Sequence, residues 1–255
     1  MSGRFDLAGR TAVVTGASSG LGAHFARVLG REGARVALVA RRAGRLAESA
    51  DSLAAEGIES STHVADVTDR SSLEAAFDEI VDRHGGIDIL VNNAGIARPR
   101  SFLKMEEDDW NTVIDTDLSG VWRTAQVAAR HMAERGRGGS IVNIASVLGL
   151  VVQPTQVNYA AAKAAVLHMT KAMARELGRH DIRVNAIAPG YFRTEINADF
   201  FETEKGKALV ERLFPGRLGR HEELDGPLLL LASQAGSFMT GTTLVVDGGT
   251  ILTDV

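Results

Sequence analysis

Short apolar runs alternate along the chain with segments whose apolar residues recur at helical spacing. The runs are rich in β-branched residues and mostly lack a period of two, as expected for strands that are buried on both faces of a parallel sheet. These runs are Thr11–Thr15, Arg35–Ala40, Ser60–Ala65, Ile87–Asn92, Ser140–Ala145, Arg183–Ile187 and Thr243–Val246, with the weakest signal at Ser60–Ala65. They predict a mostly parallel, seven-stranded sheet.

Amphipathic helices are predicted between these runs. Leu21, Phe25, Val28 and Leu29 fall at i, i+4, i+7 and i+8, which gives one apolar stripe. Because strands and helices alternate, we expect an α/β, doubly wound sheet of Rossmann type with helices on both faces. No linker or repeat divides residues 1–255, so a single domain is expected.

One segment, residues 191–220, departs from the alternation of strands and helices. Several phenylalanines lie there among charged residues. Such a segment predicts a mobile flap with an apolar underside, which would close over a substrate.

Composition narrows the class of protein. A formal net charge of −4 argues against nucleic-acid binding, and the absence of cysteine excludes disulfides, thiol catalysis and thiolate metal sites. The histidines lack paired ligand spacing, so no metal site is expected. No apolar stretch is long enough to cross a membrane and no signal-peptide core is found, so we expect a cytoplasmic protein without a membrane partner.

A glycine-rich turn follows the first predicted strand and opens the first predicted helix. Such a turn brings backbone N–H groups and the positive end of a helix to a pyrophosphate. Its spacing, G-x-x-x-G-x-G, differs from both G-x-G-x-x-G and the P-loop. The candidate cofactor-binding residues in it are Gly16, Ser18, Ser19, Gly20, Leu21 and Gly22.

The second predicted strand is followed by Arg41 and Arg42, where an NAD site would normally carry an acidic residue. Two cations suit a 2′-phosphate, so NADP(H) is favoured over NAD(H). The alternative is a pair of solvated arginines at the start of a helix. Beyond the third strand, Asp66 is a candidate for the adenine amino group or for the N-cap of the helix at Arg70–Arg83, and Val67 is expected beside it.

Tyr159 and Lys163 stand at i and i+4 on one face of a predicted helix. A cation close to a phenol favours the phenolate, so we expect the lysine to lower the tyrosine pKa and allow proton exchange near neutral pH. Ser146 ends a strand thirteen residues earlier (159 − 146 = 13) and is expected to point into the same crevice.

Taken together and in this order, these motifs resemble the short-chain dehydrogenase/reductase family, in its single-domain branch. The motifs that carry the resemblance are Thr15–Gly22, Asn92-Asn93-Ala94-Gly95, Ser146, Tyr159-x-x-x-Lys163, Pro189-Gly190 with Thr194, and Asp247-Gly248-Gly249. The resemblance covers about Leu7 to Thr250. It implies a nicotinamide-dependent enzyme that interconverts a ketone and a secondary alcohol.

The resemblance also implies roles for individual residues. Tyr159 would be the general acid/base, Lys163 would bind the nicotinamide ribose hydroxyls, and Ser146 would orient the carbonyl. Asn93, Ala94 and Gly95 would support the adenine ribose and the central strand, whereas Pro189, Gly190, Phe192 and Thr194 would approach the nicotinamide and the diphosphate. The residues expected around the substrate are Leu148, Val152, Gln153, Phe200 and Phe201.

Asp117 departs from the family pattern, which usually has asparagine in the motif N-x-x-G where this chain has Asp117–Gly120. We count Asp117 among the candidate catalytic residues, and three interpretations of its role compete. It acts through its backbone carbonyl, which we favour; it ionises and shifts the pH optimum; or it marks a weakened catalyst. We expect Asp117→Asn to keep or raise activity.

Two alternative functions remain open. One is a 3-oxoacyl-carrier-protein reductase, and the other, from a different class, is a cofactor-binding sensor without turnover. The resemblance further implies a homotetramer, formed through long helices at Leu118–Glu134 and Val157–Gly178.

Overall fold

The computed structural model describes residues 3, 5–194 and 197–252, and within them lies one seven-stranded sheet. The strand order is β3-β2-β1-β4-β5-β6-β7, and every pairing is parallel. The doubly wound, Rossmann-type fold is therefore confirmed. The strands are β1 (Thr11–Thr15), β2 (Arg35–Ala40), β3 (Ser60–Val64), β4 (Ile89–Asn92), β5 (Gly139–Ile144), β6 (Ile182–Pro189) and β7 (Thr243–Val246).

Several strand boundaries differ by one or two residues from the sequence prediction, and two of these differences have a clear physical reason. β4 begins at Ile89 rather than Ile87, because the side chain of Asp88 accepts the N–H of Thr11 at 2.9 Å just before the ladder with β1 starts. β6 continues to Pro189, where it pairs with Val246 of β7. Pairing with the edge strand β7 therefore extends β6 beyond its predicted end at Ile187.

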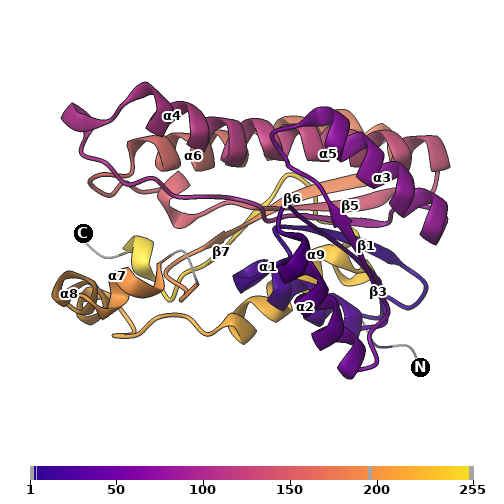
Figure 1. Cartoon of the computed structure of the whole chain (residues 1–255), viewed down its shortest axis with the longest axis horizontal. Helices are drawn as coiled ribbons and strands as arrows, with labels where there is room; N and C mark the ends of the chain where they lie inside the picture. Colours follow the sequence, from indigo (N-terminus) through magenta and orange to yellow (C-terminus); the bar gives the residue numbers. More distant parts are fainter. Residues whose placement is uncertain (1–2, 4, 195–196, 253–255) are drawn as a thin grey trace.

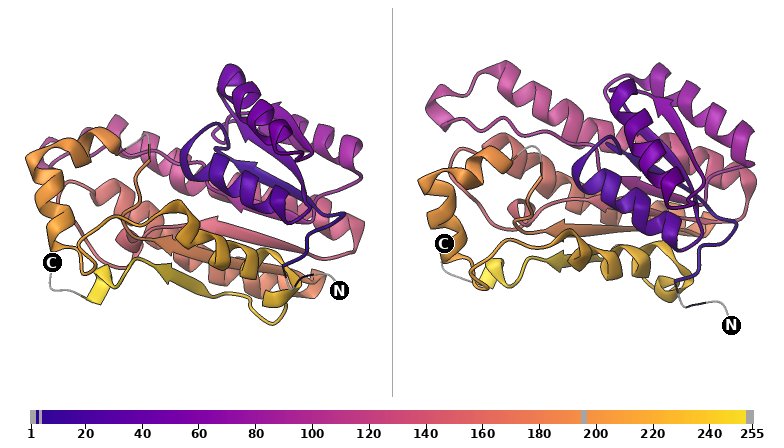
Figure 2. Two further views of the ribbon diagram at one scale, coloured as in Figure 1. Left: turned by 90° about the horizontal axis from the view of Figure 1, so that it is seen from below. Right: turned by 60° about the horizontal axis from the view of Figure 1, so that its bottom comes forward.

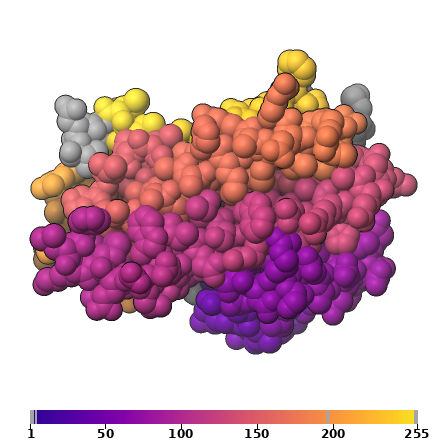
Figure 3. Space-filling model, turned by 90° about the horizontal axis from the view of Figure 1, so that it is seen from above, coloured from indigo at the N-terminus to yellow at the C-terminus, as the bar shows by residue number. Residues whose placement is uncertain are grey.

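Helices cover both faces of the sheet (Figure 1). One layer contains α3, α4, α5 and α6, while α1, α2 and α9 lie on the opposite face. Seen from above, the first of these layers forms the molecular surface (Figure 3). The bounds are α1 (Gly20–Arg31), α2 (Ala43–Ala55), α3 (Arg70–His84), α4 (Glu107–Ile114), α5 (Gly120–Arg135), α6 (Val157–Leu177), α7 (Ala198–Glu202), α8 (Glu204–Arg212) and α9 (Asp225–Ala232).

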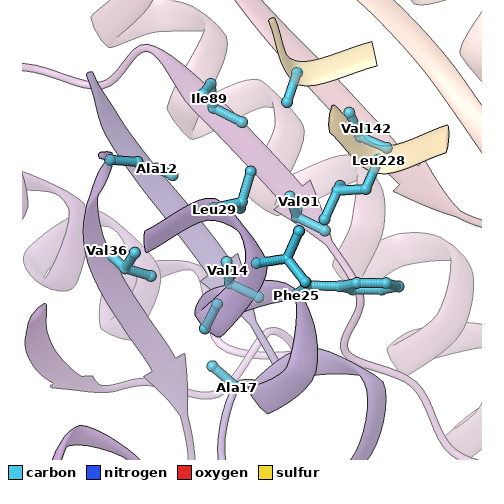
Figure 4. Packing of buried hydrophobic residues seen from close by; sticks show 14 of the residues in the cluster. Ala12, Val14, Ala17, Phe25, Leu29, Val36, Ile89, Val91, Val142 and Leu228 are labelled. Atoms are coloured by element: carbon cyan, nitrogen blue, oxygen red, sulfur yellow. The ribbon is translucent and has the colours of Figure 1, made fainter. Parts of the chain in front are cut away.

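The core is split by the sheet into two clusters, because side chains alternate between the two faces of each strand. In β1, Ala12 and Val14 point to the α1 side, where Phe25 and Leu29 pack against them (Figure 4). Val13 points the other way, to the cluster formed with α3 and α5. Burial on both faces explains why the strands read as continuous apolar runs.

A buried polar network ties α6 to the middle of the sheet. Asn92 of β4 donates to Asn143 of β5 at 3.0 Å, and Asn143 donates to Thr170 of α6 at 2.9 Å. All three residues are buried, so water does not compete for these hydrogen bonds, and the bonds fix α6 against the strands. The position of α6 is therefore set by the core.

Residues 191–220 contain the short helices α7 and α8, which lie at the same end of the molecule as α4 (Figures 1 and 2). Phe192 and Phe201 of this segment are buried, whereas Phe200 and Phe214 are exposed. The apolar underside thus contains the buried Phe192 and Phe201, with the partly exposed Phe200 packed against Phe201. Residues 195 and 196 of the expected flap lie outside the described part of the chain.

Candidate active site

A cavity of about 770 Å³ opens at the carboxyl ends of the strands, where the order changes direction between β1 and β4. Ligands of open α/β sheets bind at such a switch point. Most residues expected from the sequence line it. These are Gly16, Ser18, Ser19, Gly20, Leu21, Arg41, Arg42, Asp66, Val67, Asn93, Ala94, Gly95, Asp117, Ser146, Leu148, Gln153, Tyr159, Lys163, Pro189, Gly190, Phe192, Thr194, Phe200 and Phe201.

Two expected residues do not line the cavity. Val152 is 82% exposed, so its assignment to the substrate pocket was wrong; the neighbouring Gln153 faces the cavity instead. Gly22 is buried beneath the cradle and acts there by its small size. The lining residues that sequence reasoning missed are Val39, Ala40, Ala65, Ile96, Ala97, Pro99, Thr116, Ile144, Ala145, Val147, Thr155, Gln156, Tyr191 and Asn197.

The glycine-rich turn is packed too closely for side chains at two positions. A Cβ on Gly22 would lie 2.2 Å from the carbonyl oxygen of Gly16. Gly16 itself has φ +66°, and a Cβ there would lie 2.9 Å from Cα of Ala94. The first turn of α1 carries no acidic residue, so its free N–H groups face the cavity without a neighbouring negative charge.

Thr15 joins the two strands that flank the switch point. Its hydroxyl accepts the N–H groups of Asn93 at 3.0 Å and Ala94 at 3.1 Å. The Asn93 amide donates in turn to the carbonyl of Thr15 at 3.0 Å. The expected supporting role of Asn93 thus has a direct physical basis, because its side chain holds the end of β1 beside the end of β4.

Both arginines after β2 lie at the rim of the cavity. Arg42 donates to the hydroxyls of Ser18 and Ser19 at 3.1 and 3.0 Å. Arg41 lies 3.5 Å from Asp66 and its side chain is 64% exposed. Both guanidinium groups therefore lie at the cavity, Arg42 against two serine hydroxyls and Arg41 against the Asp66 carboxylate.

The N-cap alternative for Asp66 is wrong. Asp69 caps α3, accepting from the N–H groups of Ser71 and Ser72. Asp66 instead accepts the N–H and hydroxyl of Thr68, within its own turn. Although burial opposes ionisation, these donors and Arg41 lower the pKa of Asp66, which therefore stays charged.

These residues fit a dinucleotide. Because Gly16 and Gly22 have no Cβ, a ligand can approach the backbone of the cradle closely. The N-terminus of α1 suits a diphosphate. Arg41 and Arg42 suit a further phosphate. Opposite the cradle, Ser146, Tyr159 and Lys163 line the same cavity. One continuous cavity therefore joins the glycine-rich cradle to these three side chains.

A family model described as Enoyl-(Acyl carrier protein) reductase matches residues 16–250. The chain belongs to the short-chain dehydrogenase/reductase family. Its relatives include a 3-oxoacyl-[acyl-carrier-protein] reductase of Thermotoga maritima, 40% identical over 96% of this chain and 99% of the relative. The gluconate 5-dehydrogenase of Gluconobacter oxydans is 42% identical over 96% of both chains.

Solved structures of similar sequence share the fold. A gluconate 5-dehydrogenase from Burkholderia cenocepacia, in complex with NADP and tartrate, is 40% identical over 98% of both chains, with a TM-score of 0.94. This short-chain dehydrogenase/reductase is therefore an oxidoreductase that interconverts ketones and secondary alcohols with a nicotinamide dinucleotide, which confirms the reaction class inferred from the sequence.

The candidate catalytic residues of this dehydrogenase/reductase lie at the junction of β5 and α6. Lys163 Nζ donates to the carbonyl of Ile144 at 3.2 Å and lies 5.4 Å from the centre of the Tyr159 ring. Ser146 Oγ accepts the N–H of Leu148 at 3.1 Å. Ser146 also lies within hydrogen-bonding reach of Tyr159, and this contact lowers the pKa of the phenol.

The tyrosine pKa differs in direction from the sequence prediction. Burial raises the pKa of Tyr159 above its ordinary value, and Lys163 lowers it, but Asp117 raises it again. The prediction of a lowered pKa was therefore wrong for the protein alone. That prediction considered the positive charge of Lys163 but left out the burial of the phenol and the negative charge of Asp117.

Asp117 lies in a π-helical turn, Asp115–Ser119, directly before α5. Its side chain is 0% exposed; Oδ1 accepts the N–H of Ile96 at 2.8 Å, and Oδ2 lies 3.2 Å from Lys163 Nζ. The sequence interpretation that we favoured, action through the backbone carbonyl, did not include this ion pair. The carboxylate contacts the lysine directly.

The substrate end of the cavity has uncharged walls. Tyr191 donates from its hydroxyl to Gln153 at 2.9 Å, and its ring packs edge-on against Phe201. Oε1 of Gln156 is buried and accepts no hydrogen bond from the described residues. Aromatic rings beside amide groups suit a substrate with both apolar and hydroxyl-bearing parts.

The described residues contain no group of three or more His, Cys, Asp or Glu side chains arranged to hold a metal ion. None of their helices is both long and apolar enough to cross a membrane.

Proposed function

We propose that this chain is an NADP(H)-dependent reductase of small ketones, with Tyr159 as the general acid/base. The observation that carries the proposal is the common cavity of Ser146, Tyr159 and Lys163 with the glycine-rich cradle. Ser146 would orient the substrate oxygen, Tyr159 would exchange a proton with it, and Lys163 would hold the ribose hydroxyls. The bound dinucleotide supplies or accepts the hydride.

A screen of substrates tests this function. Purified protein is mixed with NADPH or NADH and with simple ketones, a 5-keto sugar acid or a 3-oxoacyl thioester, and absorbance at the nicotinamide band is followed. We expect turnover with an uncharged ketone. Cofactor binding without turnover of any substrate would contradict the proposal and favour the sensor alternative.

A 3-oxoacyl-carrier-protein reductase is the second candidate. The specific observation in its favour is the similarity to the Thermotoga maritima protein of that name. In the screen this activity would appear as a preference for the 3-oxoacyl thioester. The uncharged walls around Gln153 and Phe201 accommodate either an acyl chain or a small ketone.

The preference for NADP(H) rests on Arg41 and Arg42. Since hydrogen bonds to a charged partner are strong, Arg41→Asp should lower kcat/KM for NADPH on the order of 100-fold and shift the preference towards NADH. Arg45→Asp is the matched control, because Arg45 lies on α2 close to Glu48 and does not line the cavity. A wild-type preference for NADH by about tenfold or more, equivalent to 1.4 kcal/mol, would contradict this proposal.

We further infer self-association as a homotetramer and a cytoplasmic location. Trp110 of α4 and Trp122 of α5 are 39% and 44% exposed, and both helices belong to the layer that carries the expected contacts. Large aromatic side chains at a surface are typical of protein interfaces. The cytoplasmic location rests on the absence of cysteine.

A further inference from the structure

The carboxylate of Asp117 is a buried charge inside the proton-transfer site. It is enclosed by Gly95, where a Cβ would lie 2.8 Å from Oδ2, by the N–H of Ile96, and by Lys163. Oδ2 accepts no well-aligned hydrogen bond from the described residues, so its close partner is the lysine charge. A buried ion that is held mainly by one countercharge interacts strongly with it.

The position of Asp117 follows from the turn that carries it. In the π-helical turn, the N–H of Gly120 donates to the carbonyl of Asp115, five residues back. Such single turns are frequent at functional sites. The neighbouring Asp115 points elsewhere and pairs with Arg123 of α5 at 2.7 Å.

The titratable and charged side chains of the helices packed around Asp117 either face its carboxylate or are paired elsewhere. From α6, Lys163 and Tyr159 face it. From α4, Asp109 pairs with Arg100 at 3.2 Å. Asp117 therefore acts electrostatically on two groups, the lysine that it touches and the tyrosine one helical turn before that lysine.

We propose that Asp117 is a positioning residue that holds Lys163 by its charge and thereby sets the pH at which Tyr159 exchanges its proton. Lys163 favours the phenolate of Tyr159, and a carboxylate within 3.2 Å of the same ammonium opposes that effect. Burial and Asp117 both raise the pKa of Tyr159, in agreement with this geometry. The inference rests on the proposed role of Tyr159 as acid/base.

The chain has two tyrosines, Tyr159 and Tyr191, which allows a direct test. In a Tyr191→Phe background, Tyr159 is the one remaining phenol, and its ionisation can be followed by ultraviolet absorbance in the protein without cofactor. Adding Asp117→Asn should lower the titration midpoint by about one pH unit or more. Asp115→Asn, the matched control in the same turn, should leave the midpoint unchanged.

Two further variants separate charge from shape. Asp117→Ala removes the charge without adding an amide and should lower the midpoint as Asp117→Asn does, whereas Asp117→Glu keeps a carboxylate and should keep the midpoint high. An unchanged midpoint in both Asp117→Asn and Asp117→Ala would overturn the proposal, as would a rise in either.

The titration needs no turnover, so its failure is distinguishable from failure of the proposed function. If the chain catalyses ketone reduction but the midpoint does not move, only the role of Asp117 is wrong. In an active enzyme, the rate of alcohol oxidation in Asp117→Asn should reach its plateau at lower pH than in the wild type, by the same shift.

Discussion

Tyr159→Phe is expected to lower kcat for ketone reduction on the order of 1,000-fold, because general acid/base catalysis by one side chain contributes about 100- to 10,000-fold. Phenylalanine keeps the ring beside Lys163 and removes only the hydroxyl. The affinity for NADPH, measured by the fluorescence of the bound cofactor, should stay within about threefold of the wild-type value, which is less than 1 kcal/mol.

Tyr191→Phe is the control for this prediction. It also removes a phenol from the cavity wall, but one whose hydroxyl is bonded to Gln153. We expect it to lower kcat less than about tenfold, a loss of under 1.4 kcal/mol in the barrier. Equal activity of Tyr159→Phe and wild type would exclude Tyr159 as the acid/base.

Lys163→Met is expected to remove activity and also to destabilise the fold. It leaves the Asp117 carboxylate buried without its countercharge, and breaking one side of a buried ion pair costs about 3–5 kcal/mol. Denaturant unfolding should detect this loss at neutral pH. The double variant Lys163→Met/Asp117→Asn should recover most of the stability while staying inactive.

The pH dependence of Lys163→Met should identify the cause. Burial raises the pKa of Asp117, so in this variant the folded state binds a proton more tightly than the unfolded state does. Stability is then greatest below the ordinary carboxyl pKa and falls as the pH rises above about 4. A loss of stability that does not vary with pH would show that packing, and not the unpaired charge, is responsible.

Local spacing made much of this site predictable. Tyr159 and Lys163 stand one helical turn apart, and Ser146 follows a strand, so periodicity alone brings them to one edge of the sheet. The glycine-rich turn was recognisable because it lies between a strand and a helix. The fold was predictable because strands that are buried on both faces of a sheet appear in the sequence as continuous apolar runs.

Prediction from the sequence failed where contacts join segments that are distant along the chain. The pairing of Asp117 with Lys163 depends on a π-helical turn and on the space above Gly95, and neither leaves a periodic signal. Val152 was placed in the pocket wrongly, because a loop gives no rule for which of two neighbours points inward. Thr155 and Asn197 were missed for the same reason.

The hydrogen bonds between Thr15 and the Asn93–Ala94 turn have a consequence for cofactor affinity. They join protein groups to one another, so the shape of the cradle does not depend on a ligand to order it. A preorganised receptor loses little conformational entropy on association, and more of the gross contact energy then appears as affinity. We therefore expect a nicotinamide dinucleotide to associate rapidly and in a single phase.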